Sequence, residues 1–322
     1  MVILLKEKLK NVRCIRLHLY RAFGLTIKSP ISLPEMLQVE VENPDVEIVL
    51  GPVDVAEFAP ESMEQRPFKW WQVVPSEERL LFGCNAGIYD ITCGNKITIE
   101  VEPGTTQEMI RLFLLGSALG AIQIQRGRVP IHGGAIVAQG RAVIITGQQG
   151  AGKSTMTSAL VGNGFKYLTD DVSSVEIEGG TITVNPAYPQ RKLVRDACVQ
   201  LGYDPETLPV VDAERDKFAI RDRKGWHDCP VPGGMILELV PVKEGESLHS
   251  EPIGGHAKLT FIMNNLYRLQ MHVAGGSMPP HVFKKILTIA AGIDVYRVYV
   301  PRGITRIAAI AAELAEEFAL IP

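Results

Sequence analysis

One segment of the chain combines glycines, a lysine and a hydroxyl in the order that phosphate-binding loops use. Gly147-Gln148-Gln149-Gly150-Ala151-Gly152-Lys153-Ser154 fits the pattern G-x-x-x-x-G-K-[ST]. In such a loop the backbone N–H groups and the positive end of the following helix point at the phosphates. Lys153 would reach the β- and γ-phosphates, and the Ser154 hydroxyl would join the Mg²⁺ shell. We therefore predict that ATP with Mg²⁺ binds to the loop and the first helical turn, through Gly147, Gly150, Ala151, Gly152, Lys153, Ser154 and Thr155.

The segments on either side of this loop have the character that the motif requires. Ala142–Thr146 is an apolar, β-branched run and predicts a buried strand. Lys153–Val161 predicts a helix, which Gly162-Asn163-Gly164 would end. A glycine-rich turn without a ligand is the alternative, and we favour the phosphate-binding interpretation because strand, loop and helix follow in the required order.

Two adjacent carboxylates, Asp170 and Asp171, follow the next predicted strand, Phe165–Thr169. One carboxylate can hold Mg²⁺ while the other accepts a proton from an attacking hydroxyl. The alternative is an Asx turn that leads into Val172 and Ser173. We favour the functional pair because the phosphate-binding loop precedes it so closely in the chain.

His132 is a further candidate because Pro130-Ile131-His132-Gly133-Gly134 precedes the predicted hairpin that leads into the loop. A lone histidine is more often structural, and its spacing does not decide between the two roles. The other six histidines have no metal-ligand spacing.

Four cations after the acidic pair are open to two interpretations. Arg191, Lys192, Lys217 and Arg221 could steady phosphates or an acidic substrate. We predict instead that they are solvated surface charges, which is the commoner role of Lys and Arg.

The elements that must position these residues predict a mixed α/β fold (α+β overall). Residues 1 to about 104 are β-rich, with short apolar runs separated by turn signals such as Asn43-Pro44 and Gly94-Asn95. A helix to about Gln125 would begin with a capping box formed by Thr105 and Glu108. We predict a β-rich domain over residues 1–127 and a P-loop catalytic domain over residues 128–322.

The second half alternates predicted strands and helices. Hairpins are expected at residues 134–146 and 174–185, and strands at Met235–Val240 and Val295–Val300. A helix is expected near Arg191–Gly202, and a polar loop is expected at Lys243–His256. Three further helices are predicted at Leu259–Leu269, Pro280–Ala291 and Thr305–Leu320.

The composition of the 322 residues is that of a globular protein, with 46% hydrophobic and 21% charged residues. A net charge of −3 and a pI of about 6.2 argue against nucleic acid and anionic lipid as partners. The short apolar run Met1–Leu5 is too short for a secretory signal, and no stretch is long enough to span a membrane. Five widely spaced cysteines without a C-x-x-C pair are typical of a reducing compartment. We predict a cytoplasmic protein.

The order His132-Gly133, a strand hairpin, Gly150-x-Gly152-Lys153-Ser154 and then Asp170-Asp171 resembles the catalytic domain of HPr kinase/phosphorylase, a phosphoenolpyruvate-carboxykinase-like fold. The resemblance covers about Arg128–Ile177. It implies that Asp170 is the catalytic base, that Asp171 is the metal-side or supporting carboxylate, and that His132 is an active-site neighbour. The later Glu-x-Arg-Gly-x-Gly signature of that family is absent, and Thr155 replaces the Glu of its bifunctional members.

A wider resemblance extends over nearly the whole chain. The strings Tyr20-Arg21-Ala22-Phe23-Gly24-Leu25, Leu114-Leu115-Gly116, Arg126-Gly127 and Ala187-Tyr188-Pro189 are similar to those of HPr-kinase-related proteins from peptide natural-product clusters. These include lasso-peptide kinases, which phosphorylate the C-terminal serine of a precursor peptide. The resemblance implies a peptide substrate.

The leading hypothesis is therefore an ATP- and Mg²⁺-dependent serine kinase in which Lys153, His132, Asp170 and Asp171 carry the chemistry. A small-molecule kinase or carboxykinase of the same fold is one alternative. A nucleotide-gated regulatory protein without transferase activity is another. The sequence leaves open whether the chain forms a homo-oligomer.

Overall fold

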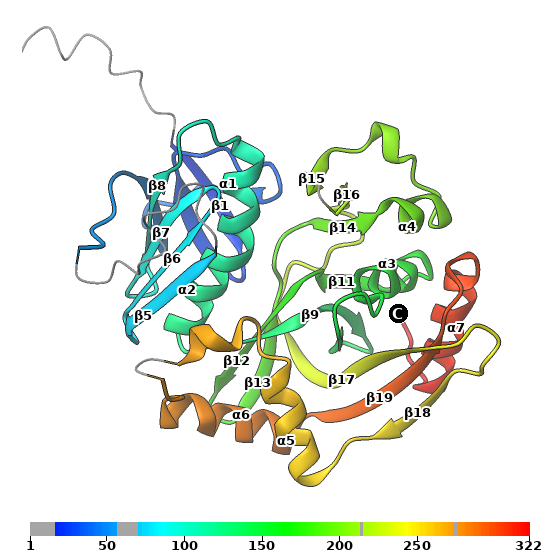
Figure 1. The fold of residues 1–322 in the computed structure, drawn as a ribbon. Helices are drawn as coiled ribbons and strands as arrows, with labels where there is room; N and C mark the ends of the chain where they lie inside the picture. The colour runs from blue at the N-terminus through cyan, green and yellow to red at the C-terminus, as the bar shows by residue number, and fades with distance from the viewer. Residues whose placement is uncertain (1–16, 57–69, 213–214, 274–275) are drawn as a thin grey trace, which may run out of the picture.

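The computed structural model describes residues 17–56, 70–212, 215–273 and 276–322, and contains two large β-sheets (Figure 1). The first sheet has the strand order β3-β1-β2-β4-β8-β7-β6-β5. Neighbours pair antiparallel except β2–β4 and β4–β8, which are parallel. Its strands are β1 (His18–Ala22), β2 (Leu25–Ser29), β3 (Leu37–Gln38), β4 (Val46–Leu50), β5 (Trp71–Ser76), β6 (Arg79–Cys84), β7 (Gly87–Thr92) and β8 (Lys96–Val101). The β-rich character predicted for the first hundred residues is confirmed for the part of them that the structure describes.

A long helical segment follows β8 and covers this sheet (Figure 1). It consists of α1 (Gln107–Phe113), a π-helical turn (Leu114–Ala118) and α2 (Leu119–Gln125). The predicted capping box is wrong by one residue. Thr106 is the cap, because its extended backbone (ψ 155°) lets its hydroxyl accept a hydrogen bond from the Met109 amide at 3.3 Å. Glu108 pairs with Arg111 at 3.3 Å.

The second sheet carries the predicted P-loop and has the order β10-β9-β12-β13-β17-β19-β18, with β11 paired to β9. β9 and β10 form the predicted hairpin, β12 and β13 form the next one, and β10 and β19 both run parallel to β17. The strands are β9 (Val129–Ala138), β10 (Arg141–Gly147), β11 (Lys166–Thr169), β12 (Val172–Glu178), β13 (Thr181–Asn185), β17 (Val231–Val242), β18 (His249–Pro252) and β19 (Asp294–Pro301).

Helices cover both faces of the second sheet. Because side chains alternate along a strand, Val143 and Ile145 of β10 pack in one core with α3 (Lys153–Gly162) and α7 (Ile307–Glu317). Ile144 packs in the opposite core with α5 (Gly255–Asn264) and α6 (Pro280–Gly292). This burial on both faces explains why β10 is apolar throughout, as the sequence pattern indicated.

Part of the predicted pattern between residues 190 and 270 is wrong. The segment predicted as a helix near Arg191–Gly202 begins with a strand, β14 (Gln190–Val194), and only then forms α4 (Arg195–Gln200). β14 pairs with β16 (Lys217–Arg221), which also pairs with β15 (Val210–Asp212). These long-range hydrogen bonds stabilise the extended conformation against a local helical preference. The predicted loop Lys243–His256 contains β18. The helix α5 begins four residues before Leu259 and ends five residues before Leu269, the bounds expected from the sequence.

The first sheet shares one hydrophobic core with residues of the second half. Buried side chains of β1, β2 and the helical segment form a cluster with Val172, Ala187, Tyr188 and Tyr267. The division at residue 127 stays a prediction. The mixed α/β class, with a β-rich first part and a P-loop-bearing second part, agrees with the sequence expectation.

Two further observations concern the described residues only. No helix in these ranges is long and apolar enough to cross a membrane. Cys84, Cys93, Cys198 and Cys229 are free thiols, whereas Cys14 lies outside the described residues, as does the apolar run Met1–Leu5.

Candidate active site

The motif loop joins the end of β10 to the start of α3, as its pattern predicted. Gly150 (φ 81°) and Gly152 (φ 89°) adopt the left-handed conformation that favours glycine, and Gly152 is the N-cap of α3. Apart from the adjoining residues of the loop, no atom of the described residues lies within 4 Å of the position that a Cβ would take at either glycine. The loop therefore has open space on this side, next to the N-terminus of a helix.

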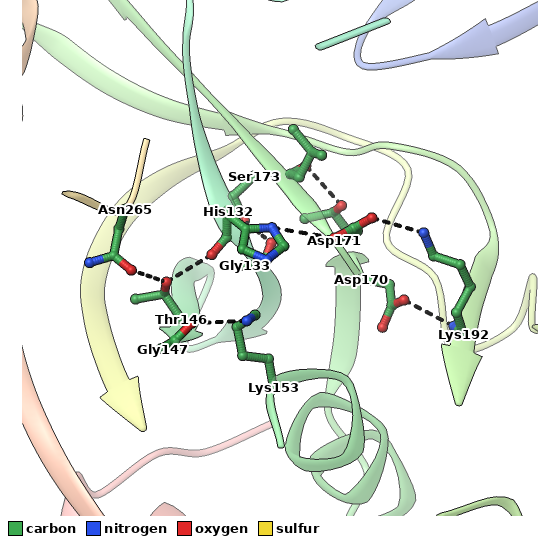
Figure 2. Close-up of polar contacts among 12 residues, drawn as sticks. His132, Gly133, Thr146, Gly147, Lys153, Asp170, Asp171, Ser173, Lys192 and Asn265 are labelled. Atoms are coloured by element: carbon green, nitrogen blue, oxygen red, sulfur yellow. Dashed lines mark hydrogen bonds and ion pairs between the residues drawn. The ribbon is translucent and has the colours of Figure 1, made fainter. Parts of the chain in front are cut away.

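The side chain of Lys153 points back to Gly147 at the start of this loop (Figure 2). Its ammonium donates hydrogen bonds to the carbonyl oxygens of Gly147 at 2.9 Å and Gln148 at 3.2 Å. Burial lowers its pKa, while Asp171 acts in the opposite direction. Ser154 and Thr155 follow on the first turn of α3 and are half-buried.

Two glycines allow β9 to pass close to β10 and to α3. A Cβ on Gly133 would lie 2.5 Å from the Ile145 carbonyl oxygen. A Cβ on Gly134 would lie 2.5 Å from Thr157 Oγ1 and 3.2 Å from the Asp170 carbonyl oxygen. Real side chains do not tolerate such approaches, so glycine is required at both positions. This passage places His132 beside the acidic pair.

Asp170 is buried, with 5% of its surface exposed. Its Oδ2 accepts a hydrogen bond from the Lys192 backbone amide at 2.9 Å, whereas Oδ1 has no partner among the described residues. Burial raises the pKa of this carboxyl, against the opposing effect of Lys192. Asp170 therefore combines an uncommitted oxygen with increased basicity.

Asp171 has the opposite electrostatic character. Its Oδ2 accepts a hydrogen bond from Lys192 Nζ at 2.8 Å, and its Oδ1 lies 3.4 Å from His132 Nδ1 (Figure 2). Burial raises the pKa of Asp171, but the charge and hydrogen bond of Lys192, with weaker effects of neighbouring groups, together outweigh it and hold the pKa well below its usual range. Burial likewise opposes the charge of Lys192, yet Asp171 raises the pKa of that lysine. Two neighbouring carboxylates thus have pKa values shifted apart, which is typical of an acid–base site.

His132 lies at the edge of this group, on β9. Its pKa is lowered by burial and by Lys153, against the opposing effect of Asp171. The ring is therefore neutral at neutral pH. The structure brings the four predicted residues Lys153, Asp170, Asp171 and His132 into one neighbourhood, and their catalytic roles remain proposals (Figure 2).

The backbone of this region is held by side chains that sequence reasoning did not single out. Thr146 Oγ1 lies 2.8 Å from both the His132 carbonyl oxygen and Asn265 Oδ1. The His132 amide donates to the Asn265 carbonyl oxygen at 2.8 Å, and Ser173 Oγ donates to the Gly133 carbonyl oxygen at 3.0 Å. No sequence signal connects Asn265 to this site, because it arrives from the end of α5, far along the chain.

The prediction of surface positions for the later cations is wrong for two of them. Arg191 is fully buried, pairs with Asp222 at 3.0 Å and lies 5.1 Å from the centre of the Tyr167 ring. Lys192 is the partner of both carboxylates and is 18% exposed. Arg221 is exposed, as predicted, and Lys217 is half-buried on β16. Arg191 and Lys192 are neighbours on β14, and successive side chains of a strand point to opposite faces. Arg191 therefore points into the protein interior, and Lys192 points toward the acidic pair.

A pocket opens beside the acidic pair and is lined from both halves of the chain. Asp170, Asp171 and Lys192 form its polar side. Phe23 from the β1–β2 turn and Leu115 from the helical segment form part of its apolar side. The residues that precede the P-loop half therefore contribute to the surroundings of Asp170.

Comparison with known proteins yields limited similarity. No protein-family model matches the chain. A candidate ABC transporter ATP-binding protein from Streptomyces coelicolor is 27% identical over 149 residues, which are 45% of this chain and 24% of that protein. The chain thus matches less than a third of the length of this relative. Among solved structures, the HPr(Ser) kinase/phosphatase from Coxiella burnetii is 14% identical with a TM-score of 0.31, over 59% of this chain and 98% of that chain. These similarities do not assign the chain to a family.

Proposed function

We propose that the chain is an ATP- and Mg²⁺-dependent kinase that transfers the γ-phosphoryl group to a serine hydroxyl of a small peptide. The C-terminal serine of a lasso-peptide precursor is the acceptor that the sequence resemblance favours. One observation carries the proposal: the open motif loop and Lys153 lie beside the buried carboxylate of Asp170, whose Oδ1 has no partner among the described residues and whose pKa is raised by burial (Figure 2).

The residues present fit a magnesium nucleotide. The open side of Gly150 and Gly152 and the N-terminus of α3 suit a phosphate. The Lys153 hydrogen bonds to loop carbonyl groups are ones that a phosphate can replace. Asp171 would be ionised at neutral pH, and with the Ser154 hydroxyl it offers the oxygen ligands that Mg²⁺ prefers. When bound, the metal would neutralise charge on the phosphates.

In the proposed reaction the acceptor hydroxyl gives its proton to Asp170 Oδ1. The hydroxyl oxygen then forms a bond to the γ-phosphorus, the bond from that phosphorus to the bridging oxygen breaks, and ADP leaves. Lys153 and the loop amides stabilise the charge on the transferring group. The Lys192 amide holds Asp170 in place, and Lys192 Nζ keeps Asp171 ionised.

The variant Asp170→Asn tests this assignment. Asparagine has nearly the same shape and can still accept the hydrogen bond from the Lys192 amide, but it cannot accept a proton. Transfer should fall by roughly 100- to 10,000-fold, the range typical of a lost general base. Nucleotide affinity should change little.

The assay uses γ-labelled ATP with peptides that end in serine, and a fluorescent nucleotide titration measures binding separately. Asp196→Asn, at an exposed aspartate on α4, is the matched control. Full turnover by the Asp170 variant would remove this residue from the mechanism. ATP hydrolysis without labelled peptide would instead favour a nucleotide-gated regulatory protein, and a labelled small molecule would favour a small-molecule kinase.

A further inference from the structure

A second pocket continues from the one beside the acidic pair. The two pockets share Leu115, Tyr188, Gln190 and Lys192 in their lining. The second pocket extends between α1, which contributes Leu112, and β15, which contributes Val210. These two elements contact each other, and β15 is an edge strand of the three-stranded sheet β14-β16-β15 (Figure 1). We call the two pockets together the acceptor cleft.

The far end of the acceptor cleft contains a buried carboxylate with an unused oxygen. Glu35 is 5% exposed, and its Oε1 accepts a hydrogen bond from Arg111 Nε at 2.8 Å. Its Oε2 is buried and has no partner among the described residues. Gln190, which is 4% exposed and lines both pockets, likewise has a buried Oε1 without a partner in the described part of the chain. Buried polar atoms are normally paired, so these two oxygens are suited to a ligand that donates hydrogen bonds.

The charges at this end point to the same kind of ligand. Arg111 also pairs with Glu108 at 3.3 Å, so two carboxylates share one guanidinium and negative charge is in excess. Lys192 cannot balance it, because its ammonium pairs with Asp171. An acidic or phosphorylated group would be repelled here, whereas an ammonium or guanidinium would be attracted.

We propose that the acceptor cleft binds a basic side chain of the acceptor peptide, and that Glu35 is the residue that selects it. A lysine or arginine at a fixed distance from the phosphorylated serine would place its cation against Glu35 Oε2. Its aliphatic stem would contact Leu112, Leu115 and Val210, as such stems commonly cover apolar surface. This inference rests on the proposed kinase function, since it assumes that the hydroxyl lies at Asp170.

The test separates binding from transfer. Peptides that end in their single serine carry lysine, norleucine or glutamate at each of the four positions before it. Binding is measured by calorimetry with the full chain, Mg²⁺ and a non-hydrolysable ATP analogue. Phosphoryl transfer from γ-labelled ATP is measured with the same peptides.

At one position, or two adjacent ones, lysine should improve binding at least tenfold over norleucine, and glutamate should weaken it. Glu35→Gln keeps the shape of the side chain and should remove this preference, while Glu244→Gln at an exposed glutamate between β17 and β18 should retain it. Val210 is 50% exposed, so the variants Val210→Glu and Val210→Arg should fold normally. Val210→Glu should strengthen the binding of the lysine peptide, and Val210→Arg should weaken it.

The outcomes distinguish the two proposals. A lysine preference that Glu35→Gln removes supports the basic subsite, even if no peptide is labelled, and the missing label then counts against the kinase function. Equal affinity for the three peptide series, or no detectable binding of any, overturns the subsite. Labelling of all peptides regardless of charge does the same while leaving the kinase function intact.

Discussion

Lys192 allows the sharpest test of how the acidic pair is held. The variant Lys192→Met removes the ammonium that lies 2.8 Å from Asp171 Oδ2 but keeps most of the apolar stem and the backbone amide that binds Asp170. Asp171 would then lack its main counter-charge beside a second carboxylate. We expect the variant to be less stable at neutral pH and to transfer phosphoryl groups more slowly, with nucleotide binding retained.

The size of the stability loss follows from the burial of the pair. At 2.8 Å and an effective dielectric constant of about 20, the Coulomb attraction is roughly 6 kcal/mol, and desolvation of both groups offsets most of it. Breaking a fully buried pair costs about 3–5 kcal/mol, whereas exposed pairs contribute about 0–1 kcal/mol. With side chains 18% and 34% exposed, this pair lies between the two cases. We expect a loss of about 2 kcal/mol.

Urea unfolding followed by tryptophan fluorescence at pH 7 measures this loss. Lys96→Met on β8 is the control, because Lys96 is exposed. Since the folded pKa of Asp171 lies below its unfolded value, the stabilisation is complete above about pH 4 and disappears as the pH falls through the lowered pKa. If both variants unfolded at the same urea concentration as the parent protein, Lys192 would be an ordinary surface charge and the account of the acidic pair would be wrong.

Two further predictions concern the close packing at Gly134 and the burial of His272, which is 3% exposed. Gly134→Ala should lower the free energy of unfolding by about 1–3 kcal/mol, because its Cβ would lie 2.5 Å from Thr157 Oγ1; in urea titrations the double variant with Thr157→Ala should recover part of the loss. Burial lowers the pKa of His272 from 6.5 to about 4, so the unfolded chain binds its proton more tightly. Stability should therefore fall by about 3 kcal/mol between pH 6.5 and pH 4, and thermal unfolding of His272→Phe over this range should show a smaller decline.

Local patterns predicted the loop, the strands and the hairpins beside it. The motif from Gly147 to Ser154 is continuous, so its strand, turn and helix depend on neighbouring residues and on burial of β10 on both faces. The hairpin between β12 and β13 has Gly179-Gly180 at its turn, which is an equally local signal. Asp170 and Asp171 could be selected for the same reason, because they follow directly on the next strand.

Errors arose where distant hydrogen bonds outweigh local preference. The strand β14 was predicted as helix because its pairing partner β16 lies more than twenty residues further along the chain, beyond α4 and β15. The same misassignment led to the wrong prediction of a surface position for Lys192, because this residue lies beside Asp171 only when β14 is a strand. The shift of the helix cap from Thr105 to Thr106 is smaller and reflects the path of the chain as it leaves β8.

Sequence alone therefore predicted the loop that would bind the nucleotide and singled out the two carboxylates as candidates, because both signals lie in consecutive residues. The tertiary structure decided which carboxylate is buried with a free oxygen and which is held by Lys192. It also decided that Glu35, from the turn that precedes β3, lines the same cleft as Gln190. Burial and pairing of this kind depend on segments that meet only on folding, and no local pattern encodes their meeting.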